Sequence, residues 1–140
     1  MPLQLGLAYD FQMTNGPTSV LRVMLADDSA AMRDRLTSLV SQIPNATVIA
    51  TVCDGQEALD RARDLRPDVL VLDLSMPRVG GLAVLEQLRG GLGQSTIIVF
   101  TNQTEAAYRG RCLAAGADAF LSKSTQVRTL EQILQRLALS

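Results

Sequence analysis

Four groups that can bind a cation or a phosphoryl group follow short apolar runs in this sequence. The runs are Val23–Ala26 before Asp27 and Asp28, Val69–Leu72 before Asp73, Ile97–Phe100 before Thr101, and Ala119–Leu121 shortly before Lys123. Lys123 is the only lysine in the sequence, and every other basic residue is an arginine. Three carboxylates, a hydroxyl and an ammonium gathered at one place could hold a divalent cation together with a phosphoryl group.

These groups would meet if the apolar runs were neighbouring strands of a parallel sheet. The carboxyl ends of such strands converge on one crevice, where ligands bind. A fifth run, Thr47–Val52, is also strand-like, and all the runs are continuous, which is typical of strands covered on both faces. Amphipathic segments with helical spacing separate the runs. The pattern predicts an α/β fold: a doubly wound, five-stranded parallel sheet with five helices.

Caps and breakers predict where the helices begin and end. Ser29 is expected to cap the first helix, which Pro44 stops. The third helix is expected to run out at Gly90-Gly91, and the fourth, over 106–115, to end at a left-handed Gly116. Residues 1–20 show no sustained period and are predicted to form a flexible extension, with one domain over 21–140.

Composition excludes several classes of function. A formal net charge of −1 gives no electrostatic footprint for nucleic acid or an anionic membrane. No apolar stretch approaches the roughly 20 residues that a membrane span requires. The N-terminus lacks the features of a signal peptide, so a cytoplasmic location is expected.

The absence of histidine narrows the chemistry further. It excludes Ser-His-Asp and Cys-His nucleophile systems and every His-ligated metal site. A bound metal would need oxygen ligands, which favours Mg²⁺, Mn²⁺ or Ca²⁺. Cys53 and Cys112 lack a CxxC spacing and are predicted to be buried, inert thiols.

Each candidate group also has an ordinary interpretation. Asp28 could simply help to start a helix, and Asp73 could be a metal ligand rather than a nucleophile on phosphorus. Thr101 could be a β-branched strand residue, and Lys123 a solvated amine. The shared position at the ends of successive runs favours the functional interpretation.

The combination resembles the receiver domain of two-component response regulators. The matching residues are Asp27-Asp28, Asp73, Pro77, Gly81, Thr101, the stretch Ala115–Phe120 and Lys123. The resemblance covers about Leu21 to Leu139. It implies a flavodoxin-like fold with strand order 2-1-3-4-5.

The resemblance also implies a role for each acidic position. Asp73 would be the phosphoacceptor and would take a phosphoryl group from a histidine of a partner kinase or phosphotransfer protein. Asp28 would bind Mg²⁺, or Mn²⁺ in its place, directly, and Asp27 would bind mainly through water. Asp73 and the main-chain carbonyl of Ser75 would complete the protein ligands.

Three further residues would transmit the change. Lys123 and Thr101 would contact the phosphoryl group, and Phe120 would rotate inward with Thr101, altering the face made by the fourth helix, fifth strand and fifth helix. The less favoured interpretation of Phe120 is an ordinary core aromatic. Gly110 should make the fourth helix marginal, which suits a switching element or a weak helix without a role.

Four positions concern the surroundings of the site and the places where this sequence departs from the family pattern. Ser75, Asn102 and Gln103 are expected to flank the site and to affect the dephosphorylation rate. Ser124 stands where many receivers have proline, so a trans peptide bond after Lys123 is expected, because a cis bond to serine would cost about 3–4 kcal/mol.

The expected function is a switch that catalyses only its own phosphoryl transfer and dephosphorylation. The kinase is expected to dock on 30–35 and 124–127. Because the sequence ends just after the fifth predicted helix, the output is expected to lie in a partner protein or in a helix-turn-helix domain outside this chain, with no direct nucleic-acid or membrane binding here. A phosphorylation-dependent homodimer through the fourth and fifth helices is a hypothesis.

Three alternatives are open. An aspartyl-phosphate phosphohydrolase usually has a second Asp two residues after the nucleophile, where this chain has Ser75. A flavin or nucleotide binder would need a phosphate-cradling loop where Asp27 and Asp28 would repel phosphate. A pseudo-receiver would be expected to lack one of the acidic or lysine positions, and none is missing.

Overall fold

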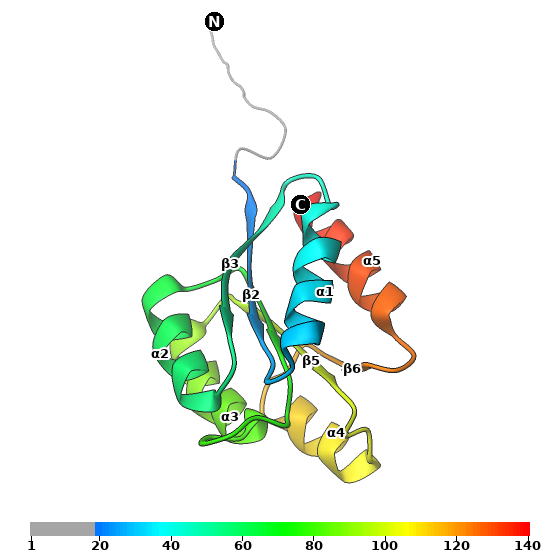
Figure 1. The fold of residues 1–140 in the computed structure, drawn as a ribbon. Helices are drawn as coiled ribbons and strands as arrows, with labels where there is room; N and C mark the ends of the chain where they lie inside the picture. Colours follow the sequence, from blue (N-terminus) through cyan, green and yellow to red (C-terminus); the bar gives the residue numbers. More distant parts are fainter. Residues whose placement is uncertain (1–18) are drawn as a thin grey trace, which may run out of the picture.

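Strands and helices alternate along the chain around one central sheet (Figure 1). The computed structural model describes residues 19–140, so most of the extension predicted over 1–20 lies outside the described residues. The elements, labelled as in Figure 1, are β2 (Leu21–Ala26), α1 (Ala30–Ser41), β3 (Ala46–Val52), α2 (Gly55–Leu65), β4 (Val69–Leu72), α3 (Gly81–Leu92), β5 (Thr96–Thr101), α4 (Ala106–Ala114), β6 (Ala119–Ser122) and α5 (Val127–Ala138). Among these helices, none combines the length and the apolar character that crossing a membrane requires.

The five strands form one parallel sheet in the order β3-β2-β4-β5-β6. Counted along the described chain, this is the order 2-1-3-4-5, so the predicted topology is confirmed. The sheet reverses its direction of winding at β2, which lies between β3 and β4. The carboxyl ends of β2 and β4 therefore lie side by side, at the end of the sheet opposite the chain's C-terminus (Figure 1).

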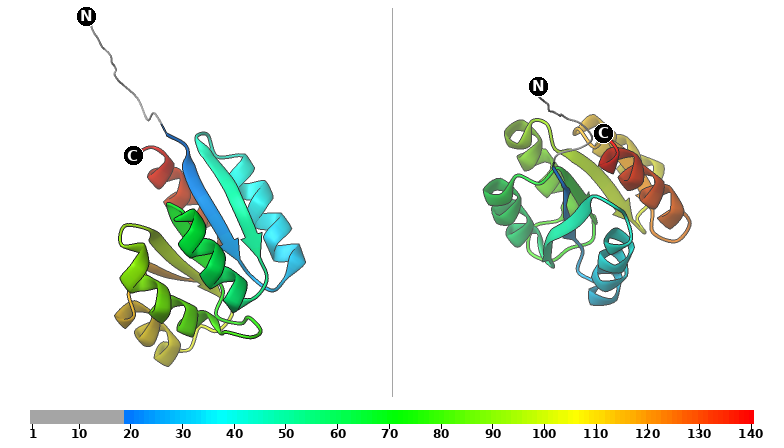
Figure 2. Two further views of the ribbon diagram at one scale, coloured as in Figure 1. Left: turned by 90° about the vertical axis from the view of Figure 1, so that its left-hand side faces the viewer. Right: turned by 90° about the horizontal axis from the view of Figure 1, so that it is seen from above.

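Helices cover both faces of the sheet. Helices α2, α3 and α4 pack on one face and α1 and α5 on the other (Figure 2). All four residues of β4 are buried, with Leu70 and Leu72 in the first core cluster and Val69 and Val71 in the second. The continuous apolar runs thus reflect a sheet covered on both sides, as predicted.

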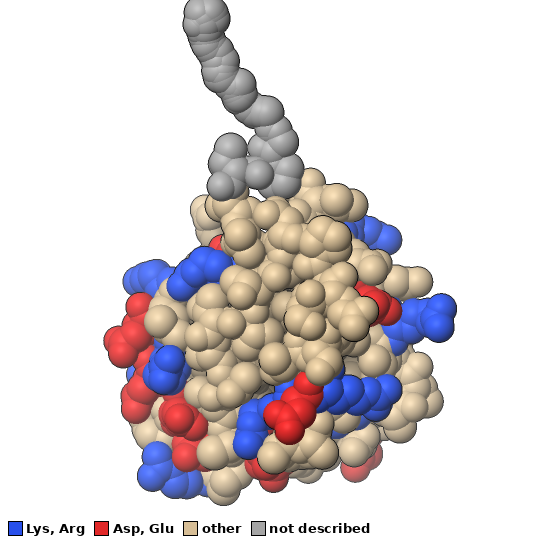
Figure 3. All heavy atoms as spheres, turned by 45° about the horizontal axis from the view of Figure 1, so that its top comes forward, with Lys and Arg blue, Asp and Glu red and all other residues tan. Residues whose placement is uncertain are grey.

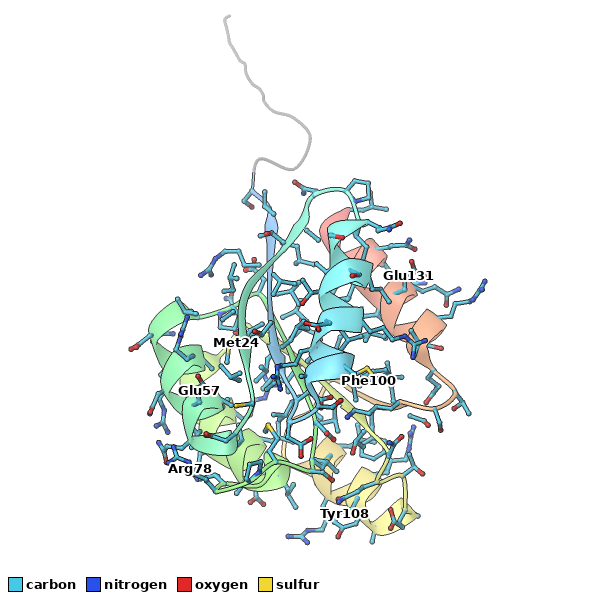
Figure 4. The ribbon with its side chains drawn as sticks, viewed as in Figure 1. Met24, Glu57, Arg78, Phe100, Tyr108 and Glu131 are labelled. Atoms are coloured by element: carbon cyan, nitrogen blue, oxygen red, sulfur yellow. The ribbon has the colours of Figure 1, made fainter. Side chains whose placement is uncertain are left out.

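The two core clusters hold the central strands between the helical layers. Met24 of β2 belongs to the cluster under α2 and α3, and Phe100 of β5 belongs to the one under α1 and α5 (Figure 4). Burying a side chain of this kind contributes about 1.5–3 kcal/mol. The strand ends that carry the polar groups are therefore fixed by packing on both sides.

Two of the predicted helix boundaries are confirmed. The Ser29 hydroxyl accepts a hydrogen bond from the Met32 N–H (3.2 Å) and caps α1. Gly116 has φ +108° after α4, and the Ala117 N–H donates to the Cys112 carbonyl (3.0 Å), which satisfies carbonyls at the helix end.

The predicted end of the third helix is wrong. Helix α3 continues through Gly90 and Gly91 to Leu92, and the left-handed turn falls at Gly93 (φ +57°). A glycine inside a helix costs only about 1 kcal/mol. The burial of Leu85 and Leu88 on the same helix outweighs that cost.

The prediction for the two cysteines is half right. Cys112, a residue of α4, is fully buried, and burial raises the pKa of its thiol. Cys53 is exposed, contrary to the prediction, because it follows the last residue of β3, which forms an edge of the sheet. An isolated cysteine carries too little periodic context for its burial to be predicted from sequence.

Gly81 is expected to tolerate no side chain. A Cβ at Gly81 would lie 2.2 Å from the backbone oxygen of Asp73, whereas a Cβ at Gly90 in the same helix would meet no described atom within 4 Å. Gly81→Ala should therefore lower the free energy of unfolding by about 1–3 kcal/mol. Gly90→Ala should raise it by about 0.5–1 kcal/mol. Urea denaturation of both variants checks this, and equal effects would contradict the close approach.

Candidate functional site

The acidic groups and the lysine meet at the carboxyl edge of the sheet. Asp27, Asp28 and Asp73 each place a carboxylate oxygen within 4.8 Å of the others. The Lys123 Nζ lies 2.7 Å from Asp27 Oδ2 and 2.9 Å from Asp73 Oδ2. The juxtaposition follows from the topology, because Asp27 and Asp73 follow the neighbouring strands β2 and β4.

Lys123 is protonated in this arrangement. Its side chain is 9% exposed, and those of Asp27 and Asp73 are 4% and 3% exposed. Burial lowers the pKa of the Lys123 ammonium, but its hydrogen bonds to the two carboxylates and their charges raise that pKa more, so the net direction is upward. The stabilising contribution of the Lys123 charge is therefore present below the usual lysine pKa of 10.5 and is lost as the pH rises through the higher folded value.

Hydrogen bonds to the side chain and to the main-chain carbonyl of Asp27 fix the loop after β2. The Ser29 N–H donates to Asp27 Oδ1 (2.9 Å), and the Arg33 guanidinium donates to the Asp27 carbonyl (2.6 Å). Asp28, the next residue, is exposed to solvent. The contact of Arg33 was not predicted from the sequence. The only sequence feature that could have indicated it is a basic residue in the first turn of the helix that follows Asp27 and Asp28.

The loop after β4 is held close to Asp73. The Ser75 N–H donates to Asp73 Oδ1 (3.3 Å), and the Gly81 N–H donates to the Leu74 carbonyl (3.1 Å). The Gly55 N–H at the start of α2 donates to the Pro77 carbonyl (3.2 Å). These bonds keep the loop near the start of both α2 and α3.

The same loop is tied to α2 by an ion pair. Arg78 adopts a left-handed conformation (φ +71°), and its Nε lies 3.4 Å from Asp54 Oδ2 (Figure 4 labels Arg78 and nearby Glu57). Asp54 Oδ1 accepts the Glu57 N–H (2.8 Å) and so caps α2.

Thr101 is fully buried and connects the lysine to the next loop. Its carbonyl accepts the Lys123 N–H (3.0 Å), and its hydroxyl oxygen accepts the Gln103 N–H (3.1 Å). The Gln103 side chain donates to the Ser75 hydroxyl (2.7 Å). The predicted flanking residues Ser75 and Gln103 therefore meet, whereas the Asn102 side chain is exposed.

Phe120 is a core residue in this structure. It is buried in the core cluster shared with α2, α3 and α4. No cis peptide bond occurs within residues 19–140, so the bond between Lys123 and Ser124 is trans, as expected.

The donor set fits a hard divalent cation. Three carboxylates face one ammonium, which leaves two formal negative charges in excess. Excess negative charge and oxygen donors suit Mg²⁺ or Mn²⁺. Asp28 is open to solvent, so an ion could enter without opening the core.

A hollow lies at the opposite edge of the sheet from these groups. It has a volume of about 650 Å³ and opens near Asn45, Arg66, Gly93 and Ser140, at the amino ends of the strands. None of the predicted site residues lines it. The polar groups that the sequence singled out therefore lie outside this hollow.

Comparison with known proteins identifies the family. The family model of the response regulator receiver domain matches residues 23–135. This chain belongs to that family. Receiver domains of two-component systems serve phosphorylation-dependent signalling, so the phosphohydrolase and flavin-binder alternatives are set aside.

Similar proteins support this assignment. Response regulator MprA of Mycobacterium tuberculosis is 39% identical over 117 residues, which cover 84% of this chain and 49% of MprA. Protein-glutamate methylesterase/protein-glutamine glutaminase 1 of Methanospirillum hungatei is 33% identical over 116 residues, 81% of this chain and 34% of that relative. The receiver thus spans about a third to a half of the length of these relatives.

Solved structures share the fold. The response regulator domain of Thermotoga maritima CheB aligns with a TM-score of 0.74 at 30% identity and covers 85% of this chain and 93% of that domain. The receiver domain of the sensor histidine kinase PA1611 from Pseudomonas aeruginosa has the same fold at a TM-score of 0.74 and 24% identity.

Loss of the Lys123 ammonium should destabilise the receiver. Lys123→Met would leave Asp27 and Asp73 buried without their counter-charge, so we expect the free energy of unfolding at neutral pH to fall by about 3 kcal/mol. Added Mg²⁺ should restore part of this loss by supplying positive charge.

Urea denaturation at neutral pH, with and without Mg²⁺, measures this effect. Arg128→Met, which removes one positive charge from an exposed position on α5, is the matched control and should change little. Equal stability of the two variants would contradict the proposed charge balance.

Proposed function

We propose that this receiver is a phosphorylation-controlled switch in which Asp73 accepts a phosphoryl group from a histidine of a partner kinase or phosphotransfer protein. The observation that carries the proposal is the position of Asp73 Oδ2, 2.9 Å from Lys123 Nζ and beside Asp27 and Asp28. A carboxylate in that place is oriented by a cation and lies next to a set of oxygen donors.

The transfer exchanges one bond to phosphorus for another. A carboxylate oxygen of Asp73 attacks the phosphorus, and the bond between phosphorus and the donor imidazole nitrogen breaks. The given sequence contains no histidine, so the donor imidazole would be supplied from outside it. Lys123, already beside Asp73, would stay within reach of the transferred oxygens and stabilise their charge.

The metal would be held by Asp28 directly, by Asp27 mainly through water, and by Asp73 and the Ser75 carbonyl. When bound, Mg²⁺ or Mn²⁺ supplies positive charge that offsets the charge of the transferring phosphoryl group. The three carboxylates support this assignment through their excess negative charge. The PA1611 receiver, which shares the fold, was solved with a magnesium ion coordinated in its active site cleft.

Phosphorylation would redirect the hydrogen bonds of Thr101. At rest its hydroxyl oxygen accepts the Gln103 N–H, and a phosphoryl group on Asp73 would offer a strongly charged acceptor for the hydroxyl hydrogen. Phe120 is already buried in the core at rest, so movement of Thr101 would change the packing of Phe120 there and, through it, the face formed by α4, β6 and α5.

The partners of this switch follow from its place in the family. The kinase would dock on residues 30–35 of α1 and on 124–127, which border the site. The output would be a downstream protein or a further domain, and MprA and the methylesterase are examples of longer relatives. Basic and acidic side chains are interspersed on the face displayed in Figure 3. Dimerisation through α4 and α5 remains a hypothesis.

Asp73 should carry the phosphate. Incubation with Mg²⁺ and acetyl phosphate is expected to add one phosphoryl group to the wild type, detected by intact mass. The adduct should require Mg²⁺ and be absent from Asp73→Asn, because an amide is a poor nucleophile. Asp68→Asn, outside the site, should still be modified. No wild-type adduct from acetyl phosphate or from a kinase would refute the switch.

The contact between Ser75 and Gln103 should slow hydrolysis of the acyl phosphate. The 2.7 Å bond joins the two loops that flank Asp73, so its loss should open the site to water. Gln103→Ala and Ser75→Ala are each expected to shorten the lifetime about two- to tenfold, the factor that corresponds to one side-chain hydrogen bond.

Release of phosphate after removal of the donor measures this lifetime. The double variant should be no faster than the faster single variant, because both substitutions remove the same bond. Gln135→Ala, the same substitution as Gln103→Ala at an exposed position of α5, is the control. A lifetime unchanged in both single variants would show that the bond has no protective role.

A further inference from the structure

Helix α4 is weakly anchored to the sheet. Of its nine described residues, only Cys112 is buried, and its N-cap residue Glu105 makes no side-chain capping bond. Gly110 lies in the middle of the helix and meets no described atom where a Cβ would be. Few contacts therefore determine where α4 lies, so each remaining contact matters more.

One of these contacts is made by Arg109. Its guanidinium carbon lies 5.8 Å from the centroid of the Phe120 ring, within the range of a cation–π interaction. Its Nη1 also donates a long hydrogen bond of 3.4 Å to the Phe120 carbonyl. Arg109 precedes Gly110 on α4 and directly follows Tyr108, which Figure 4 labels on this helix.

The position of Phe120 makes this contact specific. Strand β6 is an edge of the described sheet, so half of its backbone groups face away from β5 and need partners outside the sheet. The phenyl ring has no polar atom, so a polar link to α4 can use only the ring face and the backbone. Arg109 uses both at once.

We propose that Arg109 is the positioning residue through which Phe120 sets the place of α4. In the resting state, the guanidinium holds α4 over the Phe120 ring. Phe120 is already buried at rest, so the coupled step is a change in its packing on phosphorylation. The ring face would then move relative to the guanidinium, and α4 would lose this hold. The second step rests on the proposed function of the receiver, whereas the first concerns the resting protein alone.

The resting contact can be tested by amide hydrogen exchange of the α4 peptide. Arg109→Met keeps a long, flexible side chain and removes the charge, and we expect exchange in residues 106–115 to become about two- to fivefold faster, the factor that corresponds to an exposed cation–π contact. Arg111→Met makes the same charge change on the same exposed helix. It removes a cation from the last turn, so it should accelerate exchange less than Arg109→Met does.

The partner of Arg109 is identified by a second substitution. Phe120→Leu alone should also accelerate exchange in α4, and Arg109→Met should add little in that background, because the ring is already absent. Additive effects, or equal effects of Arg109→Met and Arg111→Met, would overturn the proposed contact.

Coupling to the site is tested with Mg²⁺ and beryllofluoride, which mimics the phosphoryl group. In the wild type and in Arg111→Met, binding of Mg²⁺ and beryllofluoride should change the rate of amide exchange in α4. In Arg109→Met, most of that change should be lost, although this variant still forms the Asp73 phosphate adduct. A full response in Arg109→Met would overturn the coupling. If the wild type forms no adduct at all, the proposed function fails, and the resting comparison alone decides the Arg109 contact.

Discussion

The balance between three carboxylates and one ammonium at the carboxyl edge of the sheet determines how the rest of the structure is used. Lys123 bridges Asp27 and Asp73 at 2.7 and 2.9 Å and so joins the ends of β2 and β4 to the chain leaving β6. The balance is incomplete, because two formal negative charges remain. A site that is stable with one cation and still attracts a second is suited to receive Mg²⁺ and a phosphoryl group.

The surroundings of this site differ in how firmly they are held. On one side, Gly81 lies so close to the Asp73 backbone that a methyl group would not fit, and α2 is tied to the same loop through Gly55. On the other side, α4 buries a single residue and relies on polar contacts such as that of Arg109. A switch requires one rigid part that positions the reacting groups and one loosely held part that can move.

Much of this could be predicted from sequence because the signals are local and periodic. Continuous apolar runs indicated buried parallel strands, and the polar groups after them indicated which residues share an edge. The caps at Ser29 and Gly116 were predictable, since each depends on the chemistry of one residue. The family resemblance contributed the strand order, which local patterns do not contain.

By itself, the sequence thus determined the fold class and the group formed by Asp27, Asp28, Asp73 and Lys123. Tertiary structure alone decided the exposure of Cys53, the passage of α3 through Gly90 and Gly91, and the contacts of Arg33 with Asp27, Gln103 with Ser75, and Arg109 with Phe120. The physical reason is that such contacts depend on the spatial packing of segments up to 28 residues apart. Neither hydrophobic periodicity nor capping chemistry encodes those distances.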